Sequence, residues 1–482
     1  MGTSQGAIGH LGFPISDLGF ANWDLRIGNR GLPYGRRSVT CNLQPVTCNR
    51  IRNMTYKETI DFLYSQLPVY HRIGKAAYKA NLNNTLALDE YFGHPHRKFS
   101  SVHVAGTNGK GSVSHMIASV LQEAGYKTAL YTSPHLKDYR ERIRINGEVI
   151  PEKEVIFFVE KNRDIINSVN PSFFEMSVAM AFDYFARAAV DVTVVETGLG
   201  GRLDSTNIIS PLLSIITNIG HDHMDLLGST LEKIAGEKAG IIKKNVPVII
   251  GEALSETRNV FSKRATLMSS ELIFAGEIYE CALEDIDLLT GVRIFRLLNR
   301  RSGETITGKT ALGGDYQVKN LPVVICAVEI LRSNFGISQQ NFIDGIKKVV
   351  LNTELRGRWE ILGNNPLIIC DTGHNMEGLR YVMNQVSKTT KSGLHMVIGF
   401  VNDKDLGSVL PLFPEDAKYY FTKASVPRAL NENILKTEAL KFGLTGSCYP
   451  GVSAALEAAK KNASEGEMIF IGGSTFIVAE AL

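Results

Sequence analysis

The fold is decided by the stretch Ser101-Val102-His103-Val104-Ala105-Gly106-Thr107-Asn108-Gly109-Lys110-Gly111-Ser112. Its first part, Ser101 to Ala105, favours a β-strand, and Val113 to Ala124 beyond it carries apolar side chains at helical spacing. The residues between them, Gly106 to Ser112, are rich in glycine. Glycines let successive backbone N–H groups and the start of a helix face an anion. The order strand, loop, helix therefore predicts a phosphate-binding loop.

Two side chains of this loop have the chemistry that a bound nucleotide needs. Lys110 can reach the β- and γ-phosphates, and Ser112 can ligate Mg²⁺. The general Walker pattern places Ser or Thr directly after the lysine, whereas Gly111 intervenes here. A flexible turn before a helix is the alternative, which the flanking strand and helix disfavour. We expect the loop to bind ATP through Thr107, Asn108, Gly109, Lys110, Gly111 and Ser112.

The chain around the loop alternates between apolar strands and helices. Such alternation predicts a mostly parallel sheet that is covered on both faces. The predicted strands are Thr128 to Tyr131, Val190 to Glu196, Leu213 to Thr217 and Val246 to Ile250, and the predicted helices include Phe173 to Ala186 and Thr230 to Ile242.

The stretch from Glu252 to Gly313 looks different, with short strand-like pieces at Leu272 to Phe274 and Val292 to Leu297, and we expect an antiparallel appendage there. The alternation restarts near Arg356. The predicted strands are Leu367 to Cys370, His395 to Ile398, Tyr419 to Phe421 and Met468 to Ile471, and the predicted helices are Met376 to Val386 and Val452 to Lys461. The fold class is therefore α/β, with an N-terminal P-loop ATPase domain at residues 54–352 and a smaller, Rossmann-like α/β domain at 353–482.

Residues 1–53 differ from the rest of the chain, since they contain many glycines and arginines but no sustained periodicity. A transit peptide is one interpretation, because acidic residues are few, but no amphipathic arginine-rich helix is evident. Met54 opens a helical pattern that runs to Leu67. We expect residues 1–53 to be an extension without catalytic residues, and Met54 to be the start of the functional chain.

The overall composition excludes several classes of protein. A chain of 482 residues with 44% hydrophobic and 21% charged side chains is too long for one typical core, which predicts two domains. A net charge of +3 is close to balance, so a nucleic-acid partner is not expected. No apolar run approaches the roughly 18 residues of a membrane span, and we expect a cytoplasmic monomer. Reduced thiols are expected for the dispersed cysteines, Cys41, Cys48, Cys281, Cys326, Cys370 and Cys448.

The loop written Gly-Thr-Asn-Gly-Lys-Gly-Ser resembles that of the folylpolyglutamate synthase and dihydrofolate synthase family, a branch of the Mur ligase superfamily. Further motifs follow in the family's order from about Met54 to the C-terminus. They are Ser133-Pro134-His135, Glu196 to Asn207, Asn218 to His223, Glu237-Lys238-Ala239-Gly240, Gly357-Arg358 and Asp371 to Asn375.

The resemblance implies a magnesium-dependent site with Lys110, His223 and Lys238 as catalytic residues. Mg²⁺ prefers oxygen ligands, and the residues implied as its ligands are Ser112, Ser133, Glu196 and His223. A structural role is the alternative for His223. Lys238 resembles a lysine that CO₂ converts to a carbamate, which would replace an ammonium by oxygen ligands. A surface lysine is the alternative reading of Lys238.

The resemblance also implies contacts with ATP and with the pterin substrate. In the second half of the chain, Asn320, Arg358 and Asp371 are implied to bind ATP. Because each of these motifs is short, a structural role is the alternative for all three residues. For Phe173 and Phe174, the alternative is a place in the protein core at the start of an apolar helix. We expect Leu82 to Asn84 to close the pterin pocket. The implied substrate-binding residues are Phe173, Phe174, Glu175, Leu203, Asp204, Ser205 and His374.

The implied reaction is the ATP-dependent joining of glutamate to a pteroate or folate carboxylate. ATP and Mg²⁺ are the implied cofactors, glutamate and pteroate or folate the implied partners, and an acyl phosphate the implied intermediate. Two alternatives stay open. A peptidoglycan-precursor Mur ligase shares the loop and the use of magnesium, but the Ser-Pro-His loop and the Glu196 to Asn207 signature favour the folate branch. A nucleotide-switch protein would use the loop without ligation.

Overall fold

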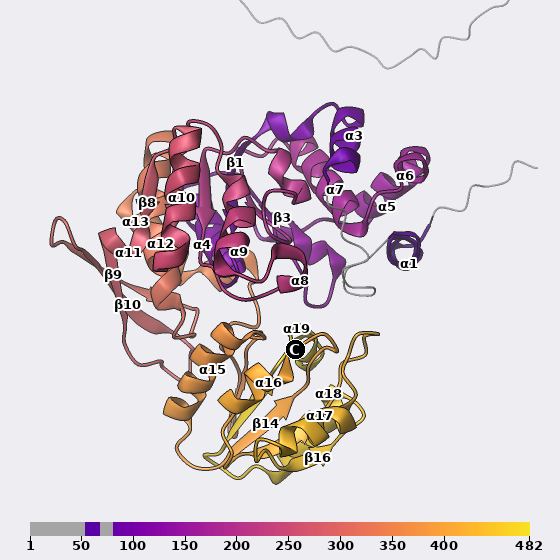
Figure 1. Ribbon diagram of the computed structural model, residues 1–482, viewed down its shortest axis with the longest axis vertical. Coiled ribbons are helices and arrows are strands. Elements are labelled where there is room, and N and C mark those ends of the chain that lie inside the picture. The colour runs from indigo at the N-terminus through magenta and orange to yellow at the C-terminus, as the bar shows by residue number, and fades with distance from the viewer. Residues whose placement is uncertain (1–53, 68–80) are drawn as a thin grey trace, which may run out of the picture. The chain divides into compact units, whose positions relative to one another are not determined.

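The structure, a computed structural model, describes residues 54–67 and 81–482. The predicted extension at residues 1–53 lies outside the described residues. The rest of the chain contains an eight-stranded sheet, a three-stranded sheet and a six-stranded sheet (Figure 1).

The eight-stranded sheet holds the phosphate loop at its centre. Its strand order is β4 (Glu148–Val149), β3 (Ile143–Ile145), β2 (Thr128–Tyr131), β5 (Val192–Glu196), β1 (Ser100–Ala105), β6 (Leu213–Ile216), β7 (Val248–Ile250) and β8 (Leu272–Phe274). Neighbours from β2 to β8 are parallel, and the β2–β3 and β3–β4 pairs are antiparallel. The expected mostly parallel sheet is confirmed. The carboxyl ends of its parallel strands lie at one edge, where ligands bind in α/β folds.

Helices cover both faces of this sheet, because its strands are apolar on both sides. Val102 and Val104 of β1 pack with α4 (Lys110–Glu123), α12 (Gln317–Phe335) and α13 (Gln339–Lys347). On the other face Ala105 packs with α9 (Leu231–Lys238) and α10 (Ser255–Met268). Short helical segments complete this side of the chain: η4 (Ser205–Ile208), α8 (Met224–Leu227), η5 (Ala239–Ile241), α11 (Ala275–Ile278) and α14 (Val349–Thr353).

A second cluster of helices packs beside β2 and β5. The buried side chains of Tyr131 and Val195 contact α5 and α7, and Figure 1 shows α3, α5, α6 and α7 gathered together. Ser172 and Glu175 form a capping box that starts α7, as Thr55 and Glu58 do for α1. The elements are α1 (Tyr56–Gln66), α3 (Asn83–Tyr91), η2 (Pro95–Lys98), η3 (Tyr139–Arg142), α5 (Glu152–Lys161), α6 (Arg163–Val169) and α7 (Phe173–Arg187).

The prediction for Glu252 to Gly313 is right in part. An antiparallel sheet does form there, from β9 (Tyr279–Leu283), β10 (Arg293–Asn299) and β11 (Thr305–Thr310). Leu272–Phe274 does not join it, however. That strand is β8, which pairs in parallel with β7 at the edge of the large sheet, because helix α10 returns the chain to that edge. The expected appendage therefore starts only at Tyr279.

The six-stranded sheet follows α14. Its order is β12 (Glu360–Asn364), β13 (Leu367–Cys370), β17 (Met468–Gly472), β14 (Leu394–Ile398), β15 (Lys418–Phe421) and β16 (Gly446–Cys448), with only β12 antiparallel. The predicted strands and helices are present. The helices are α15 (Met376–Thr389), α16 (Leu406–Val409), η6 (Leu410–Leu412), α17 (Glu432–Leu440), α18 (Val452–Asn462) and α19 (Thr475–Ala481).

The described residues bear on two expectations from the sequence, which concern the cysteines and membrane-spanning helices. Cys281, Cys326, Cys370 and Cys448 are free thiols. Among residues 54–67 and 81–482, no helix has the length and apolar character that a membrane crossing demands.

Candidate functional site

The phosphate loop leaves β1 with a backbone that requires glycine at two positions. Gly106 has a φ of 149°, and a Cβ there would lie 1.8 Å from Thr217 Oγ1. Gly109 has a φ of 85°, and its Cβ would lie 2.4 Å from Asn320 Oδ1. Larger residues would clash at both places and push the loop away from its supports. The loop geometry thus follows directly from its glycines.

Side chains that follow β6 form hydrogen bonds with the phosphate loop. Asn218 Oδ1 accepts from the Asn108 backbone N–H at 2.8 Å, and Thr217 Oγ1 donates to the Asn108 carbonyl at 2.5 Å. Thr107 Oγ1 donates to the Gly220 carbonyl and accepts from its N–H. These bonds order the loop before any ligand arrives.

Lys110 begins helix α4 and turns its ammonium back onto the loop. Its Nζ donates to the carbonyls of Gly106 at 3.0 Å and Thr107 at 3.1 Å. The helix N-terminus carries no side-chain cap, since Gly109 occupies the N-cap position. Backbone N–H groups of the first turn therefore remain available for an anion, and the positive end of the helix dipole adds to the charge of Lys110.

A buried carboxylate and a guanidinium converge on Gly111. Glu196 ends strand β5 and is buried, and among the residues that the structure describes only the Ser133 backbone N–H donates to its Oε2, at 3.3 Å. A Cβ on Gly111 would lie 3.5 Å from Arg358 Nη2 and 3.8 Å from Glu196 Oε2. Any longer side chain at Gly111 would fill the space between these two charges. This explains why a glycine separates the loop lysine from Ser112.

The environment of Glu196 favours its protonated form when no cation is bound. Burial raises the pKa of Glu196 to about 7, although the nearby charges of Lys110 and Arg358 oppose the shift. A buried carboxylate with so little hydrogen bonding is suited to bind a cation. Ser112 is also buried, and its Oγ contacts Gln317 Nε2 at 3.4 Å. Together with phosphate oxygens, Glu196 and Ser112 fit the oxygen ligands that Mg²⁺ requires.

Lys238 lies buried beneath the loop, at the end of α9. Its Nζ donates to the Gly106 carbonyl at 2.8 Å. Burial, together with the smaller effect of the Lys110 charge, lowers the pKa of Lys238 to about 7. The alternative of a surface lysine is therefore wrong. A substantial fraction of Lys238 is a neutral amine near pH 7, which is the nucleophilic form.

The structure places His223 beside Asp222, with 36% of its side chain exposed and the rest of the ring covered by the protein. Its Nε2 is 3.9 Å from Asp222 Oδ2, and burial of the ring lowers the pKa of His223 to about 4. Within residues 54–67 and 81–482, no three His, Cys, Asp or Glu side chains gather closely enough to hold a metal. Ser133 approaches Glu196 through its backbone N–H. The roles of His223 and Ser133 as magnesium ligands stay predictions.

Asp222 is a polar centre to which the sequence analysis assigned no role. Its carboxylate lies 3.4 Å from Lys404 Nζ, 3.4 Å from Asn375 Nδ2 and 3.6 Å from His374 Nε2. Burial alone would raise the pKa of Asp222, but the hydrogen bond from His374 and the surrounding positive charges hold it well below its usual range. The sequence did contain a signal for such a centre, namely a carboxylate between His221 and His223 in the loop that follows a buried strand.

The loop also contacts the segment after β13. Asn375 Nδ2 donates to Asn108 Oδ1 at 2.9 Å, and Asn108 Nδ2 donates to Asn375 Oδ1 at 3.2 Å. Asn375 Oδ1 further accepts from the Gly378 N–H, which caps α15. His374 is held by its Nδ1 near the Thr372 carbonyl. The phosphate loop and the start of α15 are thus joined by a pair of amides.

The residues predicted to bind ATP in the second half of the chain have internal partners. Asp371 is buried and accepts from Tyr316 Oη, from the Trp359 N–H and from the Gly373 N–H, each at 2.7 Å. Arg358 donates to Thr372 Oγ1. Asn320 Nδ2 donates to Gln317 Oε1 at 2.7 Å and lies against Gly109. Asn320 and Arg358 face the loop, whereas Asp371 organises the segment that carries them.

The predicted pterin-binding residues at the start of α7 contact neighbouring parts of the chain, and their role in substrate binding stays a prediction. Phe173 is buried, with its ring 5.1 Å from that of Tyr64 in a stacked arrangement, which is the packing of a core residue. Phe174 lies over Gly198, where a Cβ would come within 2.5 Å of its ring. Glu175 accepts from the Ser172 N–H at 2.6 Å and from Asn84 Nδ2 at 3.2 Å. The Asn84 contact places the start of α3 beside α7, while the predicted role of Leu82 to Asn84 in a pterin pocket stays a prediction.

The carboxylate of Asp204 accepts hydrogen bonds that order the loop after β5. Its Oδ2 accepts from the N–H groups of Gly198 and Leu199, both at 2.8 Å, and its Oδ1 accepts from the Thr206 N–H at 3.0 Å and from Thr206 Oγ1. Ser205 is buried and Leu203 partly buried next to it. The substrate role of these three residues stays a prediction.

A phosphate loop on a parallel sheet, followed by a second α/β domain, defines the class of Mur-type ligases. Residues 104–328 match the Mur ligase middle domain, and residues 357–475 match the Mur ligase glutamate ligase domain.

Three known proteins illustrate the likeness. The chain is 32% identical to a Bacillus subtilis dihydrofolate synthase/folylpolyglutamate synthase over 84% of its length and 95% of that protein. It is 30% identical to a probable bifunctional folylpolyglutamate synthase/dihydropteroate synthase of Haloferax volcanii, over 89% of the chain but only 50% of that protein. Escherichia coli FolC, solved in complex with DHPP and ADP, superposes with a TM-score of 0.77 at 26% identity, over 89% of this chain and 97% of that one. The chain belongs to the folylpolyglutamate synthase/dihydrofolate synthase family, whose members are ligases.

Replacing Asp204 by Ala should destabilise the protein, because four donors, two of them buried, would lose their acceptor. We expect the free energy of unfolding in urea to fall by about 3 kcal/mol. The exposed Asp285 provides the control, since Asp285→Ala should change stability by less than about 0.5 kcal/mol. Wild-type stability combined with a raised KM for the pterin substrate would instead give Asp204 a purely substrate-binding role.

The raised pKa of Glu196 predicts how stability depends on pH in the metal-free protein. The folded state binds the proton more tightly than the unfolded state, so the stabilisation is complete below the ordinary pKa and is lost as pH rises towards about 7. Between about pH 5 and pH 8, wild type should lose about 2 kcal/mol relative to Glu196→Gln. Urea unfolding in EDTA measures this. A constant difference between the two proteins across that range would contradict the shift.

Proposed function

We propose that this chain joins L-glutamate to the carboxylate of a pteroate or folate at the expense of ATP, through an acyl phosphate. The observation that supports this most strongly is the meeting of Lys110, Glu196 and Arg358 around Gly111. A phosphate loop with one buried carboxylate and two cations is suited to phosphoryl transfer, where positioning and charge stabilisation supply most of the catalysis.

In the first step the γ-phosphoryl group passes from ATP to the substrate carboxylate. A carboxylate oxygen attacks the γ-phosphorus, the bond from phosphorus to the bridging oxygen breaks, and ADP leaves with that electron pair. The backbone N–H groups at the start of α4 bind the phosphates, and Lys110 moves from the carbonyls of Gly106 and Thr107 onto them. Arg358 approaches from the opposite side. Mg²⁺, held by Ser112 and Glu196, would supply further positive charge against the phosphate oxygens.

In the second step the amine of glutamate attacks the acyl carbon. The tetrahedral intermediate collapses, inorganic phosphate leaves, and the amine nitrogen releases its proton as the amide forms. The groups around Asp222 have suitable charges for an amino acid, because Asp222 attracts the ammonium while Lys404 and His374 attract carboxylates. We therefore propose that His374 contacts glutamate rather than the pterin.

We also propose that Lys238 carries a carbamate in the active enzyme. The neutral amine attacks the carbon of CO₂, one C–O electron pair moves to oxygen, and a proton leaves the nitrogen. A buried lysine with a pKa of about 7 is reactive at neutral pH. The product replaces a cation by oxygen ligands directly under the phosphate loop, where an ammonium would repel Mg²⁺. All the groups named here belong to one chain, and we propose that a monomer suffices.

Replacing Lys238 by Ala should lower ligation at least about a hundredfold, and Lys238→Glu should restore part of it by supplying a carboxylate. Wild-type activity should fall when CO₂ is removed and return when bicarbonate is added, while Lys238→Glu should not respond. Incorporation of labelled CO₂ gives a second readout. Full activity of Lys238→Ala, or a Lys238→Glu variant as dependent on CO₂ as wild type, would contradict the carbamate.

Purified protein should form labelled product from ATP, glutamate and either dihydropteroate or tetrahydrofolate in separate assays. We expect both acceptors to react, since Phe174 and the loop at Asp204 are compatible with the pterin ring that they share. Lys110→Ala is the control, because it should retain the fold and lose at least about a thousandfold in kcat. Product from one acceptor alone would restrict the proposal, and no glutamate-dependent ADP release with either would refute it.

A further inference from the structure

The first turn of helix α12 contacts the phosphate loop through polar side chains. Gln317 begins this helix and is completely buried. Asn320, one turn further on, is also buried and comes so close to the loop that a Cβ on Gly109 would lie 2.4 Å from its Oδ1. None of the reaction steps proposed above uses Gln317, although its side chain lies between two residues of the nucleotide site.

The amide of Gln317 has a defined orientation, because its two ends have different partners. Asn320 Nδ2 donates to Gln317 Oε1 at 2.7 Å, so the carbonyl end of the Gln317 amide faces Asn320. Its NH₂ end then faces Ser112, where Nε2 donates to Ser112 Oγ at 3.4 Å. The Ser112 hydroxyl therefore accepts a hydrogen bond from Gln317.

This hydrogen bond determines what else the Ser112 hydroxyl can bind. A hydroxyl has one O–H donor and two lone pairs. Gln317 occupies one lone pair, which leaves the other lone pair for Mg²⁺ and the O–H for a phosphate oxygen. Without Gln317 the Ser112 side chain could adopt another staggered rotamer, and its free lone pair would lose its direction. Groups that orient a metal ligand in this way typically change metal affinity by about ten- to a hundredfold when they are removed.

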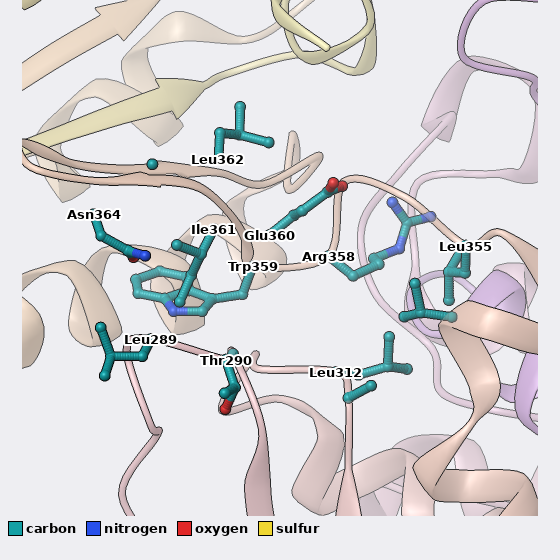
Figure 2. Close-up of a pocket in the computed structure, with 14 residues that line it drawn as sticks. Leu289, Thr290, Leu312, Leu355, Arg358, Trp359, Glu360, Ile361, Leu362 and Asn364 are labelled. Carbon is teal, nitrogen blue, oxygen red and sulfur yellow. The ribbon is translucent and has the colours of Figure 1, made fainter.

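The start of α12 is itself fixed by the residue before Gln317. Tyr316 Oη donates to Asp371 Oδ2 at 2.7 Å, and the same oxygen accepts from the Trp359 N–H, also at 2.7 Å. Figure 2 shows that the Trp359 indole and the Arg358 guanidinium leave their segment in opposite directions. The helix that carries Gln317 is thus bonded to the segment that carries Arg358.

We propose that Gln317 is a positioning residue of the ligase site, which holds the Ser112 hydroxyl in the orientation that binds the Mg²⁺ of the nucleotide. Its amide also links this hydroxyl to Asn320, so one side chain connects the metal side of the site to the residue predicted to contact adenine. Gln317 itself contacts neither metal nor nucleotide in this role. Because it takes Ser112 to be a magnesium ligand, the role rests on the proposed function.

Binding of ADP with and without Mg²⁺ tests this role without turnover. Full-length protein would be titrated with ADP in a calorimeter, once in Mg²⁺ and once in EDTA, and the ratio of the two dissociation constants measures how much the metal strengthens binding. We expect Gln317→Met to lower this magnesium effect about tenfold. Ser112→Ala should also lower it. Adding Gln317→Met to Ser112→Ala should cause no further loss, because Gln317 acts through the hydroxyl.

Gln385 of α15 provides a matched control, since it is a buried glutamine that also has a partner at each end of its amide. Its Oε1 accepts from the Asp315 N–H at 2.6 Å, and its Nε2 donates to the Gly313 carbonyl at 2.9 Å. Gln385→Met should lower stability in urea as Gln317→Met does, but leave the magnesium effect unchanged. Gln317→Asn is a second, milder variant. Its amide is one methylene shorter, so it should lose the 3.4 Å contact with Ser112 first and also show a reduced magnesium effect.

An unchanged magnesium effect in both Gln317 variants, or a further loss in the double variant, would overturn the role of Gln317 and leave the ligase proposal standing. An equal loss in Gln385→Met would overturn it as well, because the effect would then be a general loss of structure. If Ser112→Ala left the magnesium effect unchanged, the metal role of Ser112 in the proposed function would fall together with that of Gln317.

Discussion

The bonds from the end of β6 to the phosphate loop are the constraint on which the rest of the site depends. Thr217 and Asn218 hold the backbone of Asn108, and this fixes where helix α4 begins. The start of α4 in turn sets the positions of Lys110 and Ser112. Because β1 and β6 are parallel neighbours in the sheet, the two loops leave it side by side.

Burial controls the chemistry of the charged groups around this loop. In a low-dielectric surrounding, burial raises the pKa of Glu196 and lowers that of Lys238, so both move towards neutrality. Each is therefore costly to keep charged without a ligand. The proposed cation at Glu196 and the proposed carbamate on Lys238 would relieve both costs, because the cation would pair with the carboxylate and the carbamate would replace a buried ammonium by an anion that attracts the cation. The site is thus better suited to its ligated state than to its free state.

Much of the fold was predictable from the sequence, because buried parallel strands are apolar throughout and alternate with helices. The sequence prediction placed Leu272–Phe274 in the antiparallel appendage, because a three-residue apolar strand has the same pattern in either sheet. Helix α10 returns the chain to the edge of the eight-stranded sheet, where these residues pair with β7. The loop residues Gly106 to Ser112 were predictable from glycine spacing. The network at Asp222 was not, because Lys404 lies 182 residues further along the chain. The order of the motifs also could not decide whether Phe173 is a core residue or a ligand contact.

The segment after α14 brings the two halves of the site together through its backbone. Gly357 and Trp359 both have positive φ values, of 71° and 50°, and Arg358 lies between them. Asp371 accepts from the Trp359 N–H, which holds this unfavourable turn in place. The turn directs the Trp359 indole towards the six-stranded sheet and Arg358 towards Glu196. Any movement that changed the backbone here would move both side chains at once, so the position of Arg358 at the phosphate loop is coupled to the packing around Trp359.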